Sequence, residues 1–177
     1  MPTSPTGILS LAQDYLRTML ADCEQVQRFL NSGSAANALL RIHQDVLTAP
    51  ADGNAYGLAE IQALRPFIIV STAAESGFTR EMLARGAGSS HYSDSGNLEL
   101  HMEQGVPDDL AGQADEAESY FYNQIGLIVE DLRERALQGG FLAIKEIAIE
   151  EGPSRTHPDQ VNDVGDAFWC RIRVGYE

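Results

Sequence analysis

The order of the hydrophobic patterns along this 177-residue sequence is the feature that most constrains its fold. A helical pattern comes first, extended segments follow, a second helical pattern covers residues 112–138, and two strand patterns close the chain. These closing segments, FLAIKEIAIEE and AFWCRIRVGYE, place apolar residues largely at two-residue steps, which is typical of strands with one buried face. The order predicts one α+β domain over residues 1–177. In this domain, two long helices pack on one face of a mixed, mainly antiparallel sheet.

The first helix is expected over residues 5–31. Ser4 suits an N-cap and Pro5 suits the first helical position. Apolar side chains then recur at three- and four-residue steps, and the turn-forming NSGS stops the pattern near Asn31. The helix at 112–138 has acidic residues in its first turns and arginines near its end, which complements the helix dipole, and Gly139-Gly140 terminates it. Its expected core side consists of Phe121, Ile125, Ile128, Val129, Leu132 and Ala136.

The segments between the helices are read as strands and short helices. RIHQDVL is a modest strand signal, residues 34–40 suit a short helical turn, LAEIQAL suits a short helix, and FIIVSTAA suits a buried strand. NLELHMEQ alternates strictly, so Glu99, His101 and Glu103 are expected on a face turned toward solvent or a neighbouring subunit. The segment 77–96 is compatible with either a mobile hairpin tip or an edge strand.

Composition limits the classes of partner. The chain carries 12 basic and 26 acidic residues, a formal charge of −14, so an extended nucleic-acid footprint is not expected. An acidic surface past which DNA slides without adhering remains compatible with this charge. Cys23 and Cys170 lie in apolar patterns and are read as small buried hydrophobes. No signal-peptide pattern or membrane-spanning run is present, which predicts a soluble protein made in the cytoplasm, with no membrane partner.

No constellation of residues predicts catalysis. His91, Asp94 and neighbouring serines are crowded into SSHYSDSG, whereas triad members normally converge from separate elements. Glu99, His101 and Glu103 would be spaced about 7 Å apart along a strand, too far for a compact metal site without another element. The glycine-rich segments match no phosphate-binding loop. We therefore predict no catalytic, cofactor-binding or metal-binding residues, and a protein that is not an enzyme.

Two further regions are candidates for subunit contacts. Tyr120, Phe121 and Tyr122 are consecutive on a helix and cannot all face one core, so Tyr122 is assigned to an interface. The polar segment 152–165 is much longer than a usual hairpin connection, and we interpret it as an extended arm between the last two strands. A floppy loop without a role is the alternative. The candidate contact residues of this segment are Arg155, His157, Asp159 and Asp163.

In this layout the chain resembles the tail-terminator, or tail-completion, proteins of long-tailed bacteriophages. The resemblance covers most of the chain. It is carried by the first helix, RIHQDVL to PADG, FIIVST, SHYSDSGNLELHMEQGVP, the helix at 112–138, FLAIKEIAIEEGP and WCRIRVGYE. Segments 76–90 and 152–165 make the chain longer than compact members of that family.

The resemblance implies a non-enzymatic virion protein of the tail or neck, assembled in the host cytoplasm. It implies a hexameric ring that ends tail-tube polymerisation, contacts the tail tube protein and the head–tail connector, and lets DNA pass through its lumen without specific binding. A neck or head-completion adaptor at the head–tail interface is a second hypothesis. A small hydrolytic or ligand-binding domain that uses SHYSDSG is a third.

Overall fold

The structure is a computed structural model of the chain. It describes residues 8–45, 58–72, 79–86, 89–110, 113–138, 143–156 and 167–177. The helices are α1 (Ile8–Asp22), α2 (Glu24–Phe29), α3 (Ala35–Leu39), α4 (Leu58–Leu64), the 3-10 helix η1 (Asp108–Leu110) and α5 (Ala114–Leu137). The strands are β1 (Ile42–Gln44), β2 (Phe67–Thr72), β3 (Thr79–Gly86), β4 (Ser89–Gly105), β5 (Ile144–Thr156) and β6 (Ala167–Tyr176).

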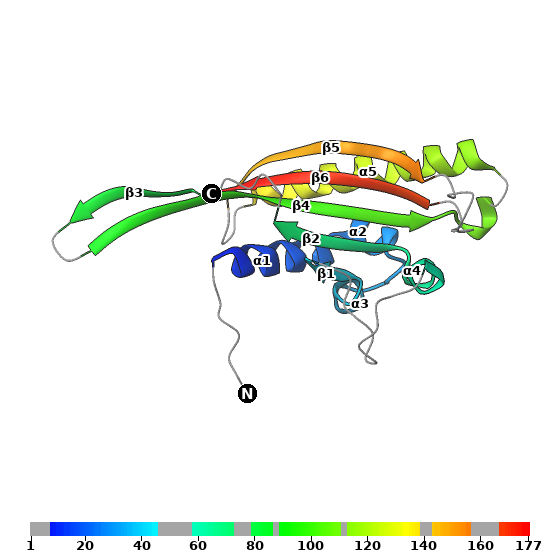
Figure 1. Cartoon of the computed structure of the whole chain (residues 1–177), viewed down its shortest axis with the longest axis horizontal. Coiled ribbons are helices and arrows are strands. Elements are labelled where there is room, and N and C mark those ends of the chain that lie inside the picture. Colours follow the sequence, from blue (N-terminus) through cyan, green and yellow to red (C-terminus); the bar gives the residue numbers. More distant parts are fainter. Residues whose placement is uncertain are drawn as a thin grey trace, which may run out of the picture.

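The centre of the fold is a mixed sheet with the strand order β1-β2-β4-β6-β5 (Figure 1). β1 runs parallel to β2, and the other neighbouring pairs are antiparallel. β3 lies outside this order, and among the described strands it pairs only with the first part of β4. The predicted α+β class with a mixed, mainly antiparallel sheet is therefore confirmed.

Alternate residues of the central strands form the core. Leu98, Leu100 and Met102 of β4 are buried, and they are in register with buried residues of β6. Buried side chains of α1, α2 and α5 belong to the same core cluster, for example Leu16 of α1 and Phe121 of α5. The alternation in NLELHMEQ thus correctly predicts which side of β4 is apolar.

The first helical region differs from the prediction, because it forms two helices instead of one. Cys23 between α1 and α2 has an extended conformation, with ψ of 125°. The break is stabilised from α5. Arg135 Nη2 donates to the carbonyl of Asp22 at 2.6 Å, and Asp131 Oδ2 accepts from the backbone N–H of Gln25 at 3.4 Å. A cation thus meets the end of α1 and an anion meets the start of α2, as the helix dipoles favour. The helical periodicity of the sequence does not reveal these partners, because they are distant in the chain.

The long second helix is confirmed as α5, and its predicted apolar side is buried at Phe121, Ile125, Ile128, Val129 and Leu132. The short elements are also confirmed. The described part of RIHQDVL contributes the three residues of β1, while α3 and α4 occupy the segments expected to be helical. The side chain of Ser34 caps α3 by accepting from the backbone N–H of Asn37. None of the helices within the described ranges is long and apolar enough to cross a membrane.

β4 is a continuous 17-residue strand with two different environments. Its second part, from Gly96 to Gly105, pairs with β6, and its first part pairs with β3 as a hairpin. Figure 1 shows this hairpin extending beyond the body of the protein, at the end opposite α4. The two alternatives for residues 77–96 are thus resolved, since the described part of the segment is a two-stranded hairpin. We call β3 and residues 89–95 of β4 the hairpin arm.

The expected arm at 152–165 is wrong in its first part. β5 continues to Thr156, and its pairing with β6 extends to Thr156 opposite Ala167. Backbone pairing with β6 therefore includes residues that had been assigned to a loop because of their polar composition. The remainder, residues 157–166, lies outside the described residues. The pairing of β5 with β6 has a register shift between Ile144 and Glu146, as at a β-bulge.

Candidate functional site

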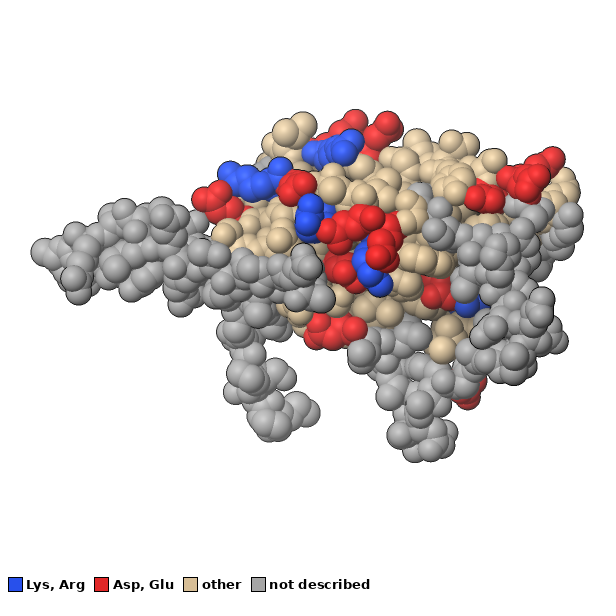
Figure 2. Space-filling view, turned by 45° about the horizontal axis from the view of Figure 1, so that its top comes forward, with Lys and Arg blue, Asp and Glu red and all other residues tan. Residues whose placement is uncertain are grey.

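The side of the sheet opposite the core cluster carries a network of ion pairs. Glu99 Oε1 of β4 lies 3.1 Å from Nε of Arg171 on β6, and Arg171 Nη1 also lies 2.9 Å from Glu151 Oε2 of β5. Arg173 Nη1 is 2.9 Å from Glu150 Oε1. The Arg171 Nε contact does not have hydrogen-bond geometry, so we treat it as an ion pair. Figure 2 shows basic and acidic side chains interleaved on one face of the molecule.

A row of rings crosses the same side of the sheet. His43 of β1, Phe67 of β2, His101 of β4 and Trp169 of β6 follow one another with centroid separations of 6.3, 6.4 and 6.2 Å. Burial and then the nearby Arg17 cation lower the pKa of His43 below its usual value, which favours the neutral ring. The row thus places the aromatic rings of Phe67 and Trp169 among histidines and charged side chains, and aromatic residues are enriched in protein interfaces.

Arg65, Glu103 and His101 form the most buried polar cluster on this face. The side chains of Arg65 and Glu103 are 8% and 15% exposed, with Arg65 Nε 2.6 Å from Glu103 Oε1. His101 Nε2 lies 3.2 Å from Glu103 Oε2. Burial opposes ionisation of Glu103, but the His101 hydrogen bond and the Arg65 cation outweigh it and lower the pKa of this carboxyl. The lowered pKa favours an ionised Glu103 paired with Arg65. A general acid would instead require a neutral carboxyl.

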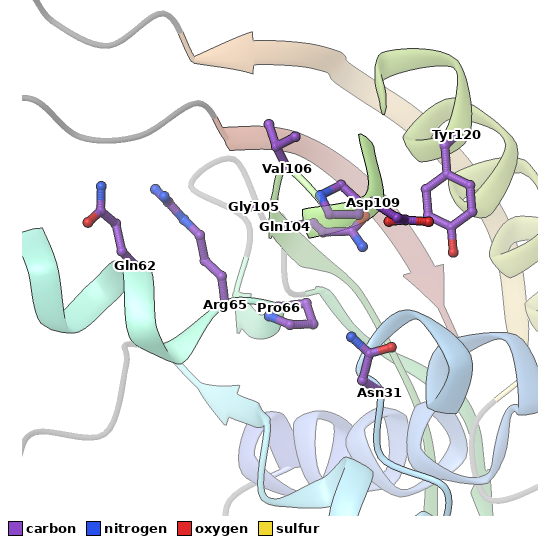
Figure 3. A pocket seen from close by; sticks show the side chains of 10 residues that line it. Asn31, Gln62, Arg65, Pro66, Gln104, Gly105, Val106, Asp109 and Tyr120 are labelled. Carbon is purple, nitrogen blue, oxygen red and sulfur yellow. The ribbon is translucent and has the colours of Figure 1, made fainter. Parts of the chain in front are cut away.

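A pocket of about 470 Å³ opens beside this cluster, at the end of the sheet where β4 finishes. Its lining residues come from the loop after α2, from α4, from the connection between α4 and β2, from the end of β4 and the residues after it, from η1 and from α5. They are Asn31, Gln62, Arg65, Pro66, Gln104, Gly105, Val106, Pro107, Asp109 and Tyr120 (Figure 3). The lining thus combines three side-chain amides with two prolines, one cation and one carboxylate. This is a mainly hydrogen-bonding surface, without the large apolar lining of most small-molecule sites.

Gln104 is the most unusual residue in this pocket. It occupies the apolar phase of β4 after Leu98, Leu100 and Met102, and only 7% of its surface is exposed. Its Oε1 is buried and accepts no hydrogen bond from any residue in the described ranges. A buried carbonyl without a donor costs free energy, commonly about 1–3 kcal/mol. A ligand that brings an N–H or O–H group into the pocket would remove this cost.

Two other exposed features are available for contacts. β5 is paired along one edge with β6, and no strand in the described part of the chain pairs with its other edge. Ile149 on β5 is 46% exposed, and register shifts on both sides of it make this edge irregular. The hairpin arm is the second feature, because among the described elements β3 packs substantially against β4 alone.

The structure unites three of the predicted contact residues on the open side of the sheet, namely Glu99, His101 and Glu103. Each is engaged by a partner, so they are components of an ordered charge network. Tyr122 lies on α5, 41% exposed, and its hydroxyl donates to Glu118 Oε1 at 2.6 Å. This hydrogen bond raises the pKa of the Tyr122 hydroxyl. The structure does not bring Tyr122 to the open face.

The remaining predicted contact residues are in the former arm segment. Arg155 lies in β5, where it is opposite Phe168 of β6, so its backbone is part of the sheet. His157, Asp159 and Asp163 lie outside the described residues. Among the described residues, no group of three or more potential ligands is arranged to hold a metal ion. His91 and Asp94 are three residues apart on the extended β4, which separates their backbones by about 10 Å.

Sequence reasoning missed Arg65, Gln104, Trp169, Arg171 and Arg173. Gln104 could have been found, because it is a polar residue in the buried phase of a strict alternation. The two arginines of β6 alternate with Cys170, Ile172 and Val174, which places them on the same side as Glu99 once the register is known. Arg65 directly precedes Pro66 after the short helix α4, and nothing in this local sequence indicates an ion pair. Its partner on β4 depends on tertiary structure.

A comparison with protein-family models and with curated proteins gives no match for this chain.

Proposed function

We propose that this protein is a structural virion component that assembles into a ring at the head–tail junction of a long-tailed bacteriophage. In this role the ring stops growth of the tail tube and offers its other surface to the head connector. The proposal combines the resemblance described above with the geometry of exposed elements. It assigns the protein a mechanism of shape and surface complementarity, without chemical catalysis.

The hairpin arm is the observation that carries the assembly role. A two-stranded hairpin alone is marginally stable in water at best. Here β3 pairs with β4, but it has no other substantial packing partner in the described part of the protein (Figure 1). An element of this kind gains stability when another chain covers it. The unpaired edge of β5 supports the same conclusion, since an exposed edge can accept a strand or loop from a neighbour.

The remaining surfaces fit a rigid ring subunit. We propose that α1 and α5 together support one side of the sheet, while the ion-pair network and ring row on the other side meet a neighbouring protein. The formal charge of −14 would keep a DNA molecule in the lumen from adhering, because phosphate binding requires clustered cations. Axial faces would then contact the tail tube protein and the connector.

The test is mass measurement of the purified protein, alone and with isolated tail tubes, followed by electron microscopy of any assembly. We expect rings in solution or on tube ends, and tubes that stop elongating when the protein is added. A protein that remains monomeric and ignores tubes at all concentrations would contradict the proposal. Rings that bind the connector and leave tube elongation unchanged would favour a neck adaptor instead.

A further inference from the structure

The pocket beside Arg65 and Glu103 contains two hydrogen-bond acceptors that lack a donor in the described part of the chain. Gln104 Oε1 is buried and unpartnered. Asp109 lies in η1 with an exposed side chain, and its carboxylate takes part in no hydrogen bond or ion pair with the described residues. Both residues line the same space of about 470 Å³ (Figure 3). An amide oxygen and a carboxylate together favour a ligand that donates hydrogen bonds and carries positive charge.

We propose that this pocket binds an alkylammonium group, which is a primary amine in its protonated form. An ammonium has three N–H donors and no acceptor, so it suits a site whose free polar atoms are oxygens. Two of its donors bind Gln104 Oε1 and the Asp109 carboxylate. The third binds a side-chain amide oxygen, which Asn31 and Gln62 both offer in the same pocket. These acceptors come from separate segments, and an ammonium can rotate to meet them, whereas a guanidinium has a fixed planar fork.

The ring of Tyr120 is a further feature that favours a cation. Tyr120 lies on α5, lines the pocket and is 46% exposed. Its hydroxyl accepts a hydrogen bond from Gln124 Nε2 at 3.1 Å, which holds the ring at the pocket wall. A cation near the face of a tyrosine ring is stabilised by the ring quadrupole. In the view of Figure 3, Tyr120 and Asp109 lie on the same side of the pocket, away from the guanidinium of Arg65.

An anionic ligand is less favourable here, although Arg65 lines the pocket. The Arg65 side chain is 8% exposed and its Nε lies 2.6 Å from Glu103 Oε1, so its charge is already paired. Arg65 is the only cation among the lining residues, and an anion would also be repelled by Asp109. The chain carries −14, and α5 starts with Asp115 and Glu116, so the electrostatic potential around the pocket also favours a cation.

The ammonium group has two possible sources, a second copy of this chain or an amine from outside the chain. Lys145 is the only lysine in the sequence, and its side chain is 59% exposed. It follows Ile144, which is opposite Tyr176 of β6, whereas the pocket residue Gly105 is opposite Ala167. These two positions on β6 are about 30 Å apart along the strand. Lys145 can therefore enter only the pocket of another copy.

Ligand-observed NMR tests the site, with ethylammonium as the probe and tetramethylammonium as its control. Both ions carry one positive charge, but tetramethylammonium has no N–H donor. We expect ethylammonium to bind about tenfold more tightly, because it alone can donate hydrogen bonds to a carboxylate and an amide. Equal affinities of the two ions, or no detectable binding of ethylammonium, would overturn the proposal.

Two substitutions locate the bound ion. Asp109→Asn keeps the size of the side chain and should weaken ethylammonium binding about tenfold through loss of the charge. Gln104→Met should weaken it about fivefold through loss of one acceptor. Glu130→Gln is the matched control, because Glu130 is an exposed acidic residue of α5 that does not line the pocket, and binding should be unchanged. Equal losses in Asp109→Asn and Glu130→Gln would refute the site. Asp109 is exposed, so this comparison holds even if Gln104→Met does not fold.

The source of the ammonium is decided by self-association. If a second copy supplies it, Lys145→Gln and Asp109→Asn should each weaken self-association about fivefold, and ethylammonium should weaken it more than tetramethylammonium does. If self-association is the same in all of these conditions while ethylammonium still binds, the ammonium comes from outside the chain. Mass measurement across a range of protein concentrations distinguishes these outcomes.

The site does not depend on the proposed ring. Rings that form although ethylammonium does not bind would leave the ring function intact and remove the ammonium site. A chain that binds ethylammonium through Gln104 and Asp109, but stays monomeric with and without tail tubes, would contradict the ring and retain the site.

Discussion

The two sides of the central sheet use the same strands for different purposes. On β4, Leu98, Leu100 and Met102 are buried in the core with the helices, whereas Glu99 and His101 of the intervening positions take part in ion pairs and ring contacts. The first side derives its stability from removal of apolar area from water. The second has many charges, but most of them remain partly exposed, so each pair contributes little. Apolar burial and charge pairing thus occupy opposite sides of one strand.

The largest effect is expected on the core side. Leu100→Ala should lower the free energy of unfolding by about 3 kcal/mol, because Leu100 is fully buried and the substitution leaves a cavity. Urea denaturation measures this change. Ile149→Ala is the matched control, since Ile149 is 46% exposed, and it should cost less than about 1 kcal/mol. Both residues lie opposite Ile172 of β6 and so share the apolar side of the sheet, and equal costs at the two positions would mean that burial does not set the contribution of this side.

Arg65→Met should have the next largest effect, about 2 kcal/mol, although Arg65 belongs to the charged side. This substitution leaves the largely buried Glu103 without its closest cation. Replacing both residues, as Arg65→Met with Glu103→Met, should recover much of the loss, because no unpaired charge is then buried. A double-mutant cycle in urea measures the coupling. Additive costs would show that the two side chains act independently.

The Glu103 carboxyl should also give the charged side a dependence on pH. Its pKa in the folded protein is below the ordinary value of 4.5, so it binds a proton less readily when folded than when unfolded. Its contribution to stability is therefore complete above the unfolded pKa and is lost as the pH falls through the lower folded pKa. Glu103→Gln should consequently lose less stability than the wild type between about pH 6 and pH 3. Urea unfolding at both pH values tests this, and parallel losses would argue against the assignment.

The smallest effect is expected from an exposed pair. Glu150→Gln removes the partner 2.9 Å from Arg173 Nη1, but both side chains are about one-third exposed. The change should cost less than about 1 kcal/mol, and the difference from the wild type should shrink in high salt, which screens exposed charges. Thermal unfolding at low and high ionic strength is the measurement. A large cost that salt does not alter would mean that this pair behaves like Arg65 and Glu103.

The parts of the fold that could be predicted from sequence are those set by local periodicity. Strict alternation identified the apolar side of β4 and β6, and the helical repeat identified the buried side of α5. The break at Cys23 could not be predicted in this way, because Asp131 and Arg135, which stabilise the two helix ends there, are more than 100 residues away. Tertiary hydrogen bonds outweighed a continuous helical pattern.

The candidate site was predictable only in part, for a related reason. Glu99, His101 and Glu103 were assigned to one face from their spacing, but their partners became apparent only from the pairing of β4 with β6 and β2. The polar composition of the segment after Glu151 predicts a loop, but residues up to Thr156 form strand. Backbone pairing with β6 does not require apolar side chains at a sheet edge. The pocket beside Arg65 and Glu103 is lined by residues from separate segments of the chain, and no local sequence pattern predicts that these segments meet.

The continuity of β4 has a mechanical consequence. A pull on the hairpin arm along the strand would be transmitted through covalent backbone into the middle of the sheet. Hydrogen bonds to β2 and β6 lie roughly perpendicular to that direction. Such a force would have to shear many of these bonds at once, whereas a peeling force breaks them one after another. The strand is therefore oriented to resist tension that is applied to the hairpin arm along its length.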